Sequence, residues 1–251
     1  MNVLALDCVS TRWTLAVKTP DKYACLTFDL GMKQGEKMLP SLIYLLGEVD
    51  LPPAALDYAA ITAGPGSFTS LRIGFAMLKA ISISHNVPIY AVPTLELYAH
   101  PFLHLYENVI SVIDSKRGAS KQDSQHAHFF ASIYRGGACV SCGDYTIEEI
   151  EEIVRLSAGM REAKERILVC GADAPSFCAI VKAHNVLPDS ENDDGSGGYK
   201  CAPALNTVDA LFELAEKMRL APSPPLAADA GPLYMRLSEA EVAAKRKDSC
   251  R

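Results

Sequence analysis

The chain has 251 residues, of which 49% are hydrophobic and 22% are charged, and its formal net charge is −6. This length and composition exclude a disordered tail and predict a folded protein with one large core or two small ones. The acidic balance argues against a protein that binds nucleic acid alone, because such a protein needs a basic surface. A role near RNA would therefore need a partner.

The first residues predict a cytoplasmic protein. Asp7 follows a five-residue apolar run that has no basic region before it, which does not fit a signal peptide. No uninterrupted apolar span approaches the roughly 20 residues that are needed to cross a bilayer. Eight cysteines are scattered along a chain too long to need a disulfide framework. Cys139 and Cys142 form a CxxC without a second pair at zinc-ribbon spacing, which favours a hairpin over a metal or redox site.

Hydrophobic periodicity predicts an α/β fold. Three strands in succession indicate an antiparallel meander, and a later strand, helix and strand indicate a parallel crossover. The second half of the chain holds fewer and more interrupted elements. The expected strands are 2–6, 13–19, 23–30, 58–62, 88–92, 109–114, 128–134 and 167–170, and the expected helices are 37–49, 71–84, 94–105, 147–154, 175–184 and 207–220.

Two of the expected helices are more apolar than one buried face requires. Helix 37–49, with Pro40 in its first turn, has a predicted core stripe and further apolar residues beside it, while helix 71–84 is apolar on nearly every side. Such helices indicate either a deep core or a helix-to-helix interface. The predicted stripe is Leu39, Leu42, Ile43 and Leu46, and the additional apolar residues are Met38, Tyr44 and Leu45.

The loop GPGSFTS precedes the second of these helices. Gly64 and Gly66 would let the backbone approach an anion, and the N–H groups that open the helix could bind it. Alternatively, Ser67 or Thr69 only caps the helix. The loop has neither a P-loop lysine nor a GxGxxG pattern. The capping interpretation is therefore slightly favoured.

Two further groups of residues could carry chemistry. Asp7, followed by Ser10 and Thr11 in a turn, is one way to hold magnesium and a phosphate, although these are also ordinary turn residues. His100 and His104 have the spacing of a helical metal pair, but the glutamate of HExxH is absent and a proline lies between them. A surface or half-buried helix is favoured there, with Thr94 as its expected N-cap.

Six segments together resemble the TsaB (YeaZ) family, in the glycoprotease-like branch of the sugar-kinase, heat-shock and actin superfamily. They occur in the family's order, and GPGSFT followed by LRIG is highly specific in this context. The resemblance covers the first 117 residues almost continuously and the end of the chain. The segments are VLALDCVSTRWTLAV, GEKMLPSLIYLL, GPGSFTSLRIG, VPIYAVPTLE, VIDSKRG and GPLYMR.

The resemblance implies two ribonuclease-H-like lobes with mixed sheets, residues 1–106 and a reduced lobe of residues 107–251. It implies a non-catalytic scaffold that pairs with TsaD and, together with TsaE, supports threonylcarbamoyl transfer to tRNA, which it meets only through the complex. Thr94 and Tyr98 stand where the catalytic paralogue TsaD has two metal-binding histidines, so no catalytic or metal residue is expected. An independent nucleotide-dependent kinase or metallopeptidase of the same superfamily is the alternative.

The resemblance also implies where partners and ligands would bind. We expect a homodimer when the chain is alone, no membrane contact and no cofactor of its own, with ATP or ADP and magnesium in the complex. The candidate interface residues are Met38, Leu42, Leu45, Leu46, Ile73, Met77, Ala80 and Ile81. The candidate phosphate site, inherited from the superfamily, is Asp7, Ser10, Thr11, Gly64, Gly66 and Ser67.

Overall fold

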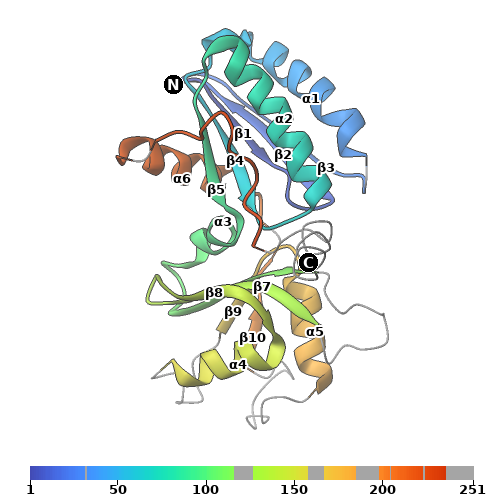
Figure 1. The fold of residues 1–251 in the computed structure, drawn as a ribbon, viewed down its shortest axis with the longest axis vertical. Helices are drawn as coiled ribbons and strands as arrows, with labels where there is room; N and C mark the ends of the chain where they lie inside the picture. The colour runs from blue at the N-terminus through green and yellow to red at the C-terminus, as the bar shows by residue number, and fades with distance from the viewer. Residues whose placement is uncertain are drawn as a thin grey trace, which may run out of the picture.

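A computed structural model of the chain describes residues 1–31, 33–115, 127–157, 167–184, 198–203, 205–222 and 224–235. Two five-stranded sheets form two lobes, one above the other in Figure 1, with a short helix at their junction. Each sheet combines an antiparallel meander with two parallel strands. The predicted α/β fold with mixed sheets is confirmed.

The first sheet has the strand order β3-β2-β1-β4-β5. Its meander and its parallel crossover are both as predicted, and the strand boundaries differ from the predicted ones by one or two residues. The strands are β1 (Val3–Asp7), β2 (Arg12–Lys18), β3 (Tyr23–Asp29), β4 (Tyr58–Gly64) and β5 (Ile89–Pro93), and the helices of this part of the chain are α1 (Gln34–Glu48), the 3-10 turn η1 (Pro53–Ala55), α2 (Phe68–His85), α3 (Thr94–Ala99) and the 3-10 turn η2 (His100–Phe102).

Both faces of the first sheet are buried. Successive side chains of a strand point to opposite faces, and every residue of β1 and β4 is buried. Leu4 and Leu6 pack in the cluster formed with α1 and α2, whereas Val3 and Ala5 pack with Leu211 of α6 (Val208–Leu220). The sheet therefore lies between α1 and α2 on one face and α6 on the other (Figure 1).

The second sheet repeats the topology of the first, because its order β10-β9-β6-β7-β8 is the same pattern in reverse. This lobe was predicted to be the smaller one, and its parallel strands β9 and β10 are short, with four and three residues. The strands β8 and β10 were not predicted from the sequence. Its strands are β6 (Asn108–Asp114), β7 (His128–Arg135), β8 (Ala138–Thr146), β9 (Ile167–Cys170) and β10 (Tyr199–Cys201), and its helices are α4 (Ile147–Leu156) and α5 (Ala174–His184).

The boundary predicted at residue 106 separates the strands of the two sheets, but residues after it also pack on the first sheet. Helix α6 belongs by sequence to the second lobe, yet its buried residues pack on the first sheet. Residues 224–235 also return to the first lobe, where the Leu226 N–H donates to the Ile89 carbonyl at 2.7 Å. Helix α6 packs there because the apolar face of the first sheet that contains Val3 and Tyr58 would otherwise be exposed.

Two local predictions are wrong. Helix α1 begins at Gln34, so Pro40 lies inside the helix and not in its first turn. Thr94 does not cap α3, because its hydroxyl accepts a hydrogen bond from the Gly64 N–H at 3.1 Å. The hairpin expected at Cys139 and Cys142 is present: both cysteines lie within β8, which pairs with β7 across a turn formed by Gly136 and Gly137 with positive φ.

Some of the sequence lies outside the described residues. These include most of the polar loop after Asp114, the loop between α5 and β10, and the end of the chain after Met235. In the part that the structure describes, no helix has both the length and the apolar character to cross a membrane.

Gly74 sets the distance between α2 and β1. An added Cβ would lie 2.6 Å from the Cys8 Sγ and 3.1 Å from the Leu6 Cδ2, both in a packed core. We expect Gly74→Ala to lower the free energy of unfolding by about 1–3 kcal/mol, measured by urea denaturation. Gly47→Ala is the matched control, because nothing lies within 4 Å of its added Cβ, and it should stabilise α1 by about 0.5–1 kcal/mol. Equal stability of the two variants would contradict this packing.

Candidate functional site

A cleft of about 340 Å³ lies where the two lobes meet. Asp7, Ser10 and Thr11 line it from the end of β1 and the following turn, as the sequence predicted for one half of a phosphate site. Gln34 holds this turn in place, since its side-chain amide donates to the Ser10 carbonyl at 3.1 Å. The opposite wall comes from the second lobe and includes Asp173.

The other half of the predicted phosphate site does not line this cleft. An added Cβ on Gly64 would lie 2.5 Å from the Leu233 carbonyl oxygen, so the C-terminal segment occupies that side of the glycine. Gly66 packs on Val9, and the Ser67 N–H donates to the Val9 carbonyl at 2.6 Å. The Ser67 hydroxyl accepts from the backbone N–H of Ser70 and caps α2. The glycines therefore serve close backbone packing, and the serine serves the cap.

Asp7 is buried at the floor of the cleft. The Thr207 hydroxyl donates to its Oδ2, and the Val9 N–H donates to its Oδ1 at 3.4 Å. Burial raises the pKa of Asp7 above its ordinary value, and the hydrogen bond from Thr207 offsets part of that rise. Asp29 and Asp173 also line the cleft, and among the described residues of its lining Arg12 is the one basic side chain. The described lining therefore carries more acidic than basic groups.

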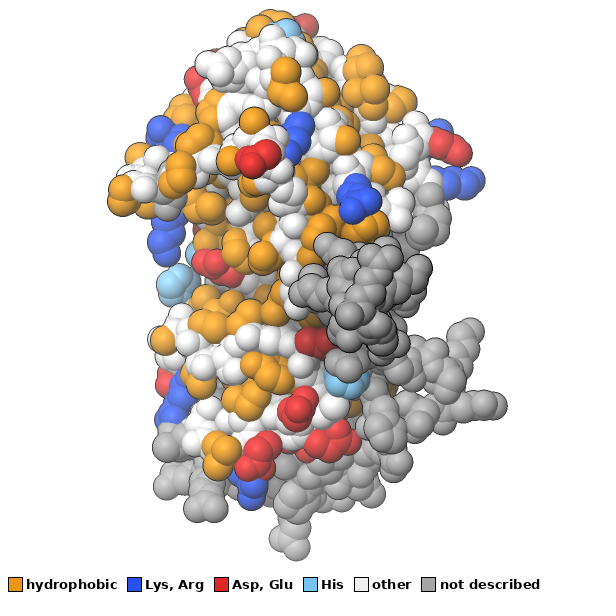
Figure 2. Space-filling model, in the orientation of Figure 1, with side chains coloured by type: hydrophobic (Ala, Val, Ile, Leu, Met, Phe, Trp, Pro, Cys, Tyr) orange, Lys and Arg blue, Asp and Glu red, His pale blue; other side chains and the backbone are white. Residues whose placement is uncertain are grey.

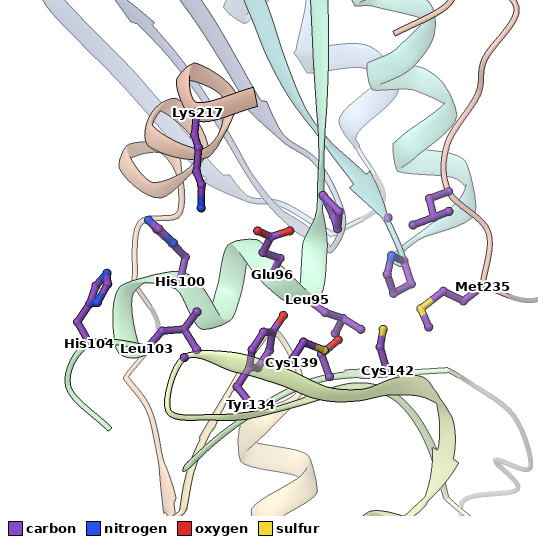
Figure 3. Close-up of a pocket in the computed structure, with 16 residues that line it drawn as sticks. Leu95, Glu96, His100, Leu103, His104, Tyr134, Cys139, Cys142, Lys217 and Met235 are labelled. Carbon is purple, nitrogen blue, oxygen red and sulfur yellow. The ribbon is translucent and has the colours of Figure 1, made fainter. Parts of the chain in front are cut away.

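A second pocket, of about 540 Å³, lies on the other side of α3 (Figure 3). It brings His100 and His104 to the same cavity as Cys139 and Cys142. The His100 Nε2 lies 3.1 Å from the Glu213 carboxylate, which occupies that nitrogen. Among the described residues, no three histidine, cysteine or acidic side chains are placed to hold a metal ion.

The two cysteines share one face of β8. The pairing of β7 with β8 shifts by one residue between Ile133 and Tyr134, so Cys139 pairs with Tyr134 and Cys142 with Ser132. Burial, followed by the neighbouring Cys142 thiol, raises the pKa of Cys139. The thiol is therefore the favoured form, which does not support a reactive or ligating pair.

Tyr98 lines the cleft, and Thr94 opens α3 between Pro93 and Leu95, which line the second pocket. Thr94 is fully buried and its hydroxyl is bonded to the GPGS loop. Burial, followed by the negative charge of Asp7, raises the pKa of Tyr98 well above its ordinary value, so the phenol keeps its proton. Both side chains are thus held within the packed junction of α3 with the first lobe.

The candidate interface residues of α1 are wrong because the structure places them in the core. Met38, Leu42, Leu45 and Leu46 are each less than a tenth exposed. On α1, Leu39 and Ile43 are instead accessible, at 54% and 64% exposed. The candidate residues of α2 keep accessible surface: Ala80 is exposed, and Ile73, Met77 and Ile81 are partly exposed.

Exposed apolar residues of α1 and α2 form one continuous surface. Gly35 lies against Ile73, since its added Cβ would be 3.5 Å from the Ile73 Cδ1. Leu39 lies four residues after Gly35 and Ile43 lies eight residues after it, so both lie on the same side of α1 as Gly35, about one and two turns further along. Ile83 is 77% exposed. We call this the α1–α2 surface, and its residues are Leu39, Ile43, Ile73, Ala76, Met77, Ala80 and Ile83.

Comparisons with known proteins find similarity to proteins named for threonylcarbamoyladenosine in tRNA. The family model "TsaD: tRNA N6-adenosine threonylcarbamoyltransferase" matches residues 33–119. A Bacillus subtilis protein named "tRNA threonylcarbamoyladenosine biosynthesis protein TsaB" is 29% identical over 120 residues, which are 47% of this chain and 52% of that protein. A Buchnera aphidicola protein of the same name, from the Schizaphis graminum symbiont, is 22% identical over 67% of this chain and 77% of its own.

Solved structures show the same fold. A Pseudomonas aeruginosa protein described as similar to peptidase YEAZ superposes with a TM-score of 0.66 at 18% identity, over 94% of this chain and 99% of that one. YeaZ from Pseudomonas aeruginosa gives 0.61 at 16% identity, over 93% and 99% of the two chains. The repeated sheet topology and the cleft between the lobes define a two-lobed α/β protein of the ribonuclease-H-like, actin-like type. Within that class the chain is similar to proteins named TsaB and to YeaZ. The matched segment spans about half the length of the Bacillus relative.

The lining of the cleft predicts how the chain responds to ATP. Because its lining is acidic and the loop glycines face elsewhere, we expect about 1 mM ATP with magnesium to leave the melting temperature of the chain almost unchanged. Differential scanning fluorimetry of the wild type and of Asp7→Ala would measure this. A clear rise in the wild type that disappears in the variant would show that the cleft does bind the nucleotide.

Proposed function

We propose that the chain is a non-catalytic scaffold subunit of the complex that forms threonylcarbamoyladenosine in tRNA, acting in the cytoplasm with TsaD and TsaE. The observation that carries this proposal is the α1–α2 surface, an apolar face left uncovered on a chain whose relatives are named for this pathway. An exposed apolar patch on a folded protein typically marks a protein interface. Figure 2 shows hydrophobic side chains along α1 and α2 in the upper lobe.

The match to the TsaD family model supports TsaD as the occupant of this surface. Residues 33–119 contain both α1 and α2, so the paralogue shares the segment that forms the surface here. A surface that pairs with its own copy about a two-fold axis can pair with a related copy in the same way. Alone, the chain would use the surface for a homodimer and would exchange that contact for TsaD.

The absence of catalysis is proposed from the residues at α3. Thr94 and Tyr98 occupy the positions of the paralogue's metal ligands, and both side chains are engaged in packing or hydrogen bonding. Neither side chain is a good replacement for an imidazole on iron or zinc. We propose that the chain needs no cofactor of its own, and that any ATP or ADP with magnesium is held by its partners in the complex. With a net charge of −6, it would contact tRNA only through those partners.

An independent kinase or metallopeptidase has less support. The histidine pair that could favour it lines the second pocket, but Glu213 engages His100, and the ring centroids of His100 and His104 are 6.4 Å apart at a steep angle. No observation on the described residues favours this second function.

A charge on the α1–α2 surface should break both pairings. Leu39→Glu and Ile83→Glu would each bury an unpaired carboxylate in either complex, which costs about 3–5 kcal/mol. We expect the homodimer to dissociate in light scattering and the affinity for TsaD to fall at least a hundredfold in calorimetry. Leu156→Glu on α4 is the matched control, because Leu156 is also an exposed leucine, at 69%, but lies in the second lobe. If folded Leu39→Glu and Ile83→Glu proteins still form both complexes, the interface lies elsewhere.

The purified chain should have neither peptidase nor transferase activity. The assay would contain tRNA, threonylcarbamoyl-adenylate and added iron or zinc, with tRNA modification measured by mass spectrometry of the nucleosides. The expected result is no turnover, because no pair of imidazoles holds a metal at α3. Turnover that persists after repurification, and that requires His100 or His104, would favour the enzyme alternative.

A further inference from the structure

The C-terminal segment, residues 224–235, returns from α6 along the edge of the first sheet to α2 (Figure 1). It is held near its start by the bond from Leu226 to Ile89 on β5. The Lys79 Nζ donates to the Ala228 carbonyl at 2.8 Å, and the Leu233 N–H donates to the Ala63 carbonyl at 2.7 Å. The segment therefore has a fixed position beside α2 on the side opposite to α1.

This path places Tyr234 on the first turns of α2. Its ring centroid lies 5.2 Å from that of Phe68, and the Arg72 Nε donates to its hydroxyl at 3.2 Å. The Arg72 Cζ lies 3.8 Å from the Phe68 ring centroid, a cation–π contact. An aromatic face and a hydroxyl thus fix the guanidinium on two sides.

The guanidinium still has hydrogen-bond donors to offer. Its Nε is used by Tyr234, and in the described part of the chain Arg72 has no carboxylate within ion-pair distance. All three residues are accessible, with Phe68 and Tyr234 42% and 41% exposed. A stacked, immobilised arginine loses little side-chain freedom when it binds a carboxylate, and its planar fork matches that group.

The cluster is continuous with the α1–α2 surface. Phe68, Arg72, Ala76 and Ala80 follow one another at intervals of four, so they form one stripe along the exposed side of α2. Arginine and aromatic residues are also the types that most often dominate the energy of protein interfaces. Figure 2 shows basic side chains among hydrophobic ones on this face of the upper lobe.

We propose that Phe68, Arg72 and Tyr234 form an anchor at one end of the α1–α2 surface, and that Arg72 binds a carboxylate of the TsaD partner there. The anchor rests on the proposed function, since it extends the same interface. It also gives the C-terminal segment a role: Tyr234 positions Arg72 from a part of the chain more than 150 residues away in sequence.

The test measures the affinity of purified variants for TsaD of the same organism by calorimetry, after circular dichroism has shown that each variant is folded. We expect Arg72→Ala to weaken binding about tenfold or more. Arg72→Lys should not restore it, because lysine lacks the planar fork. Tyr234→Phe, which keeps the ring and loses the hydroxyl, should weaken binding by a smaller factor. Raising the salt concentration should weaken the wild type more than Arg72→Ala.

Lys79→Ala is the matched control, because Lys79 is the other basic residue that α2 offers to the C-terminal segment. It should leave the affinity within about twofold of the wild type. If Arg72→Ala and Lys79→Ala have the same effect, Arg72 only fastens the segment and the anchor is wrong. If Leu39→Glu abolishes binding while Arg72→Ala does not change it, the anchor alone fails. If Leu39→Glu and Ile83→Glu both bind normally, the proposed function fails and the anchor fails with it.

Discussion

Burial of the first sheet on both faces is the constraint on which the rest of the structure depends. Because every residue of β1 and β4 is buried, the sheet needs a helical layer on each side. Helices α1 and α2 form one layer, and α6 must return from the far end of the chain to form the other. The segment after α6 then starts beside β5 and is led to the GPGS loop and α2. The cleft, the second pocket and the Arg72 cluster all follow from that path.

The same constraint explains why the GPGS loop has a structural role here. Gly64 allows the Leu233 carbonyl to approach, and Gly66 allows Val9 to approach, so the two glycines join α2 to the turn after β1 and to the C-terminal segment. A loop of this composition is compatible with anion binding, but the backbone N–H groups of Gly64 and Ser67 are already engaged. What the loop positions is α2, whose outer face belongs to the proposed interface.

Much of the fold could be predicted because its signals are local. Alternation along β1 to β3 and the change of period at α1 and α2 depend on neighbours in the sequence, and so do the turns between them. The strand β8 was missed because its burial is partial, and β10 was missed because it has three residues and pairs with β9, which is about thirty residues earlier in the chain. At the candidate site, Asp7, Ser10 and Thr11 could be grouped from the sequence because they are close along the chain, and they line one cleft. Gly64, Gly66 and Ser67 could not be placed without knowing where Leu233 and Val9 lie.

The sequence by itself determined the α/β class, the order of most elements, the presence of two over-apolar helices and the family resemblance. Only the tertiary structure decided which side of α1 is buried, and it exchanged Leu39 and Ile43 for Met38 and Leu45 in the core. The reason is that an apolar residue has the same hydrophobicity on either side of a helix, so its burial depends on which neighbour covers it. Tyr234 beside Arg72 is a contact of the same kind, because no local pattern connects residues so far apart in the chain.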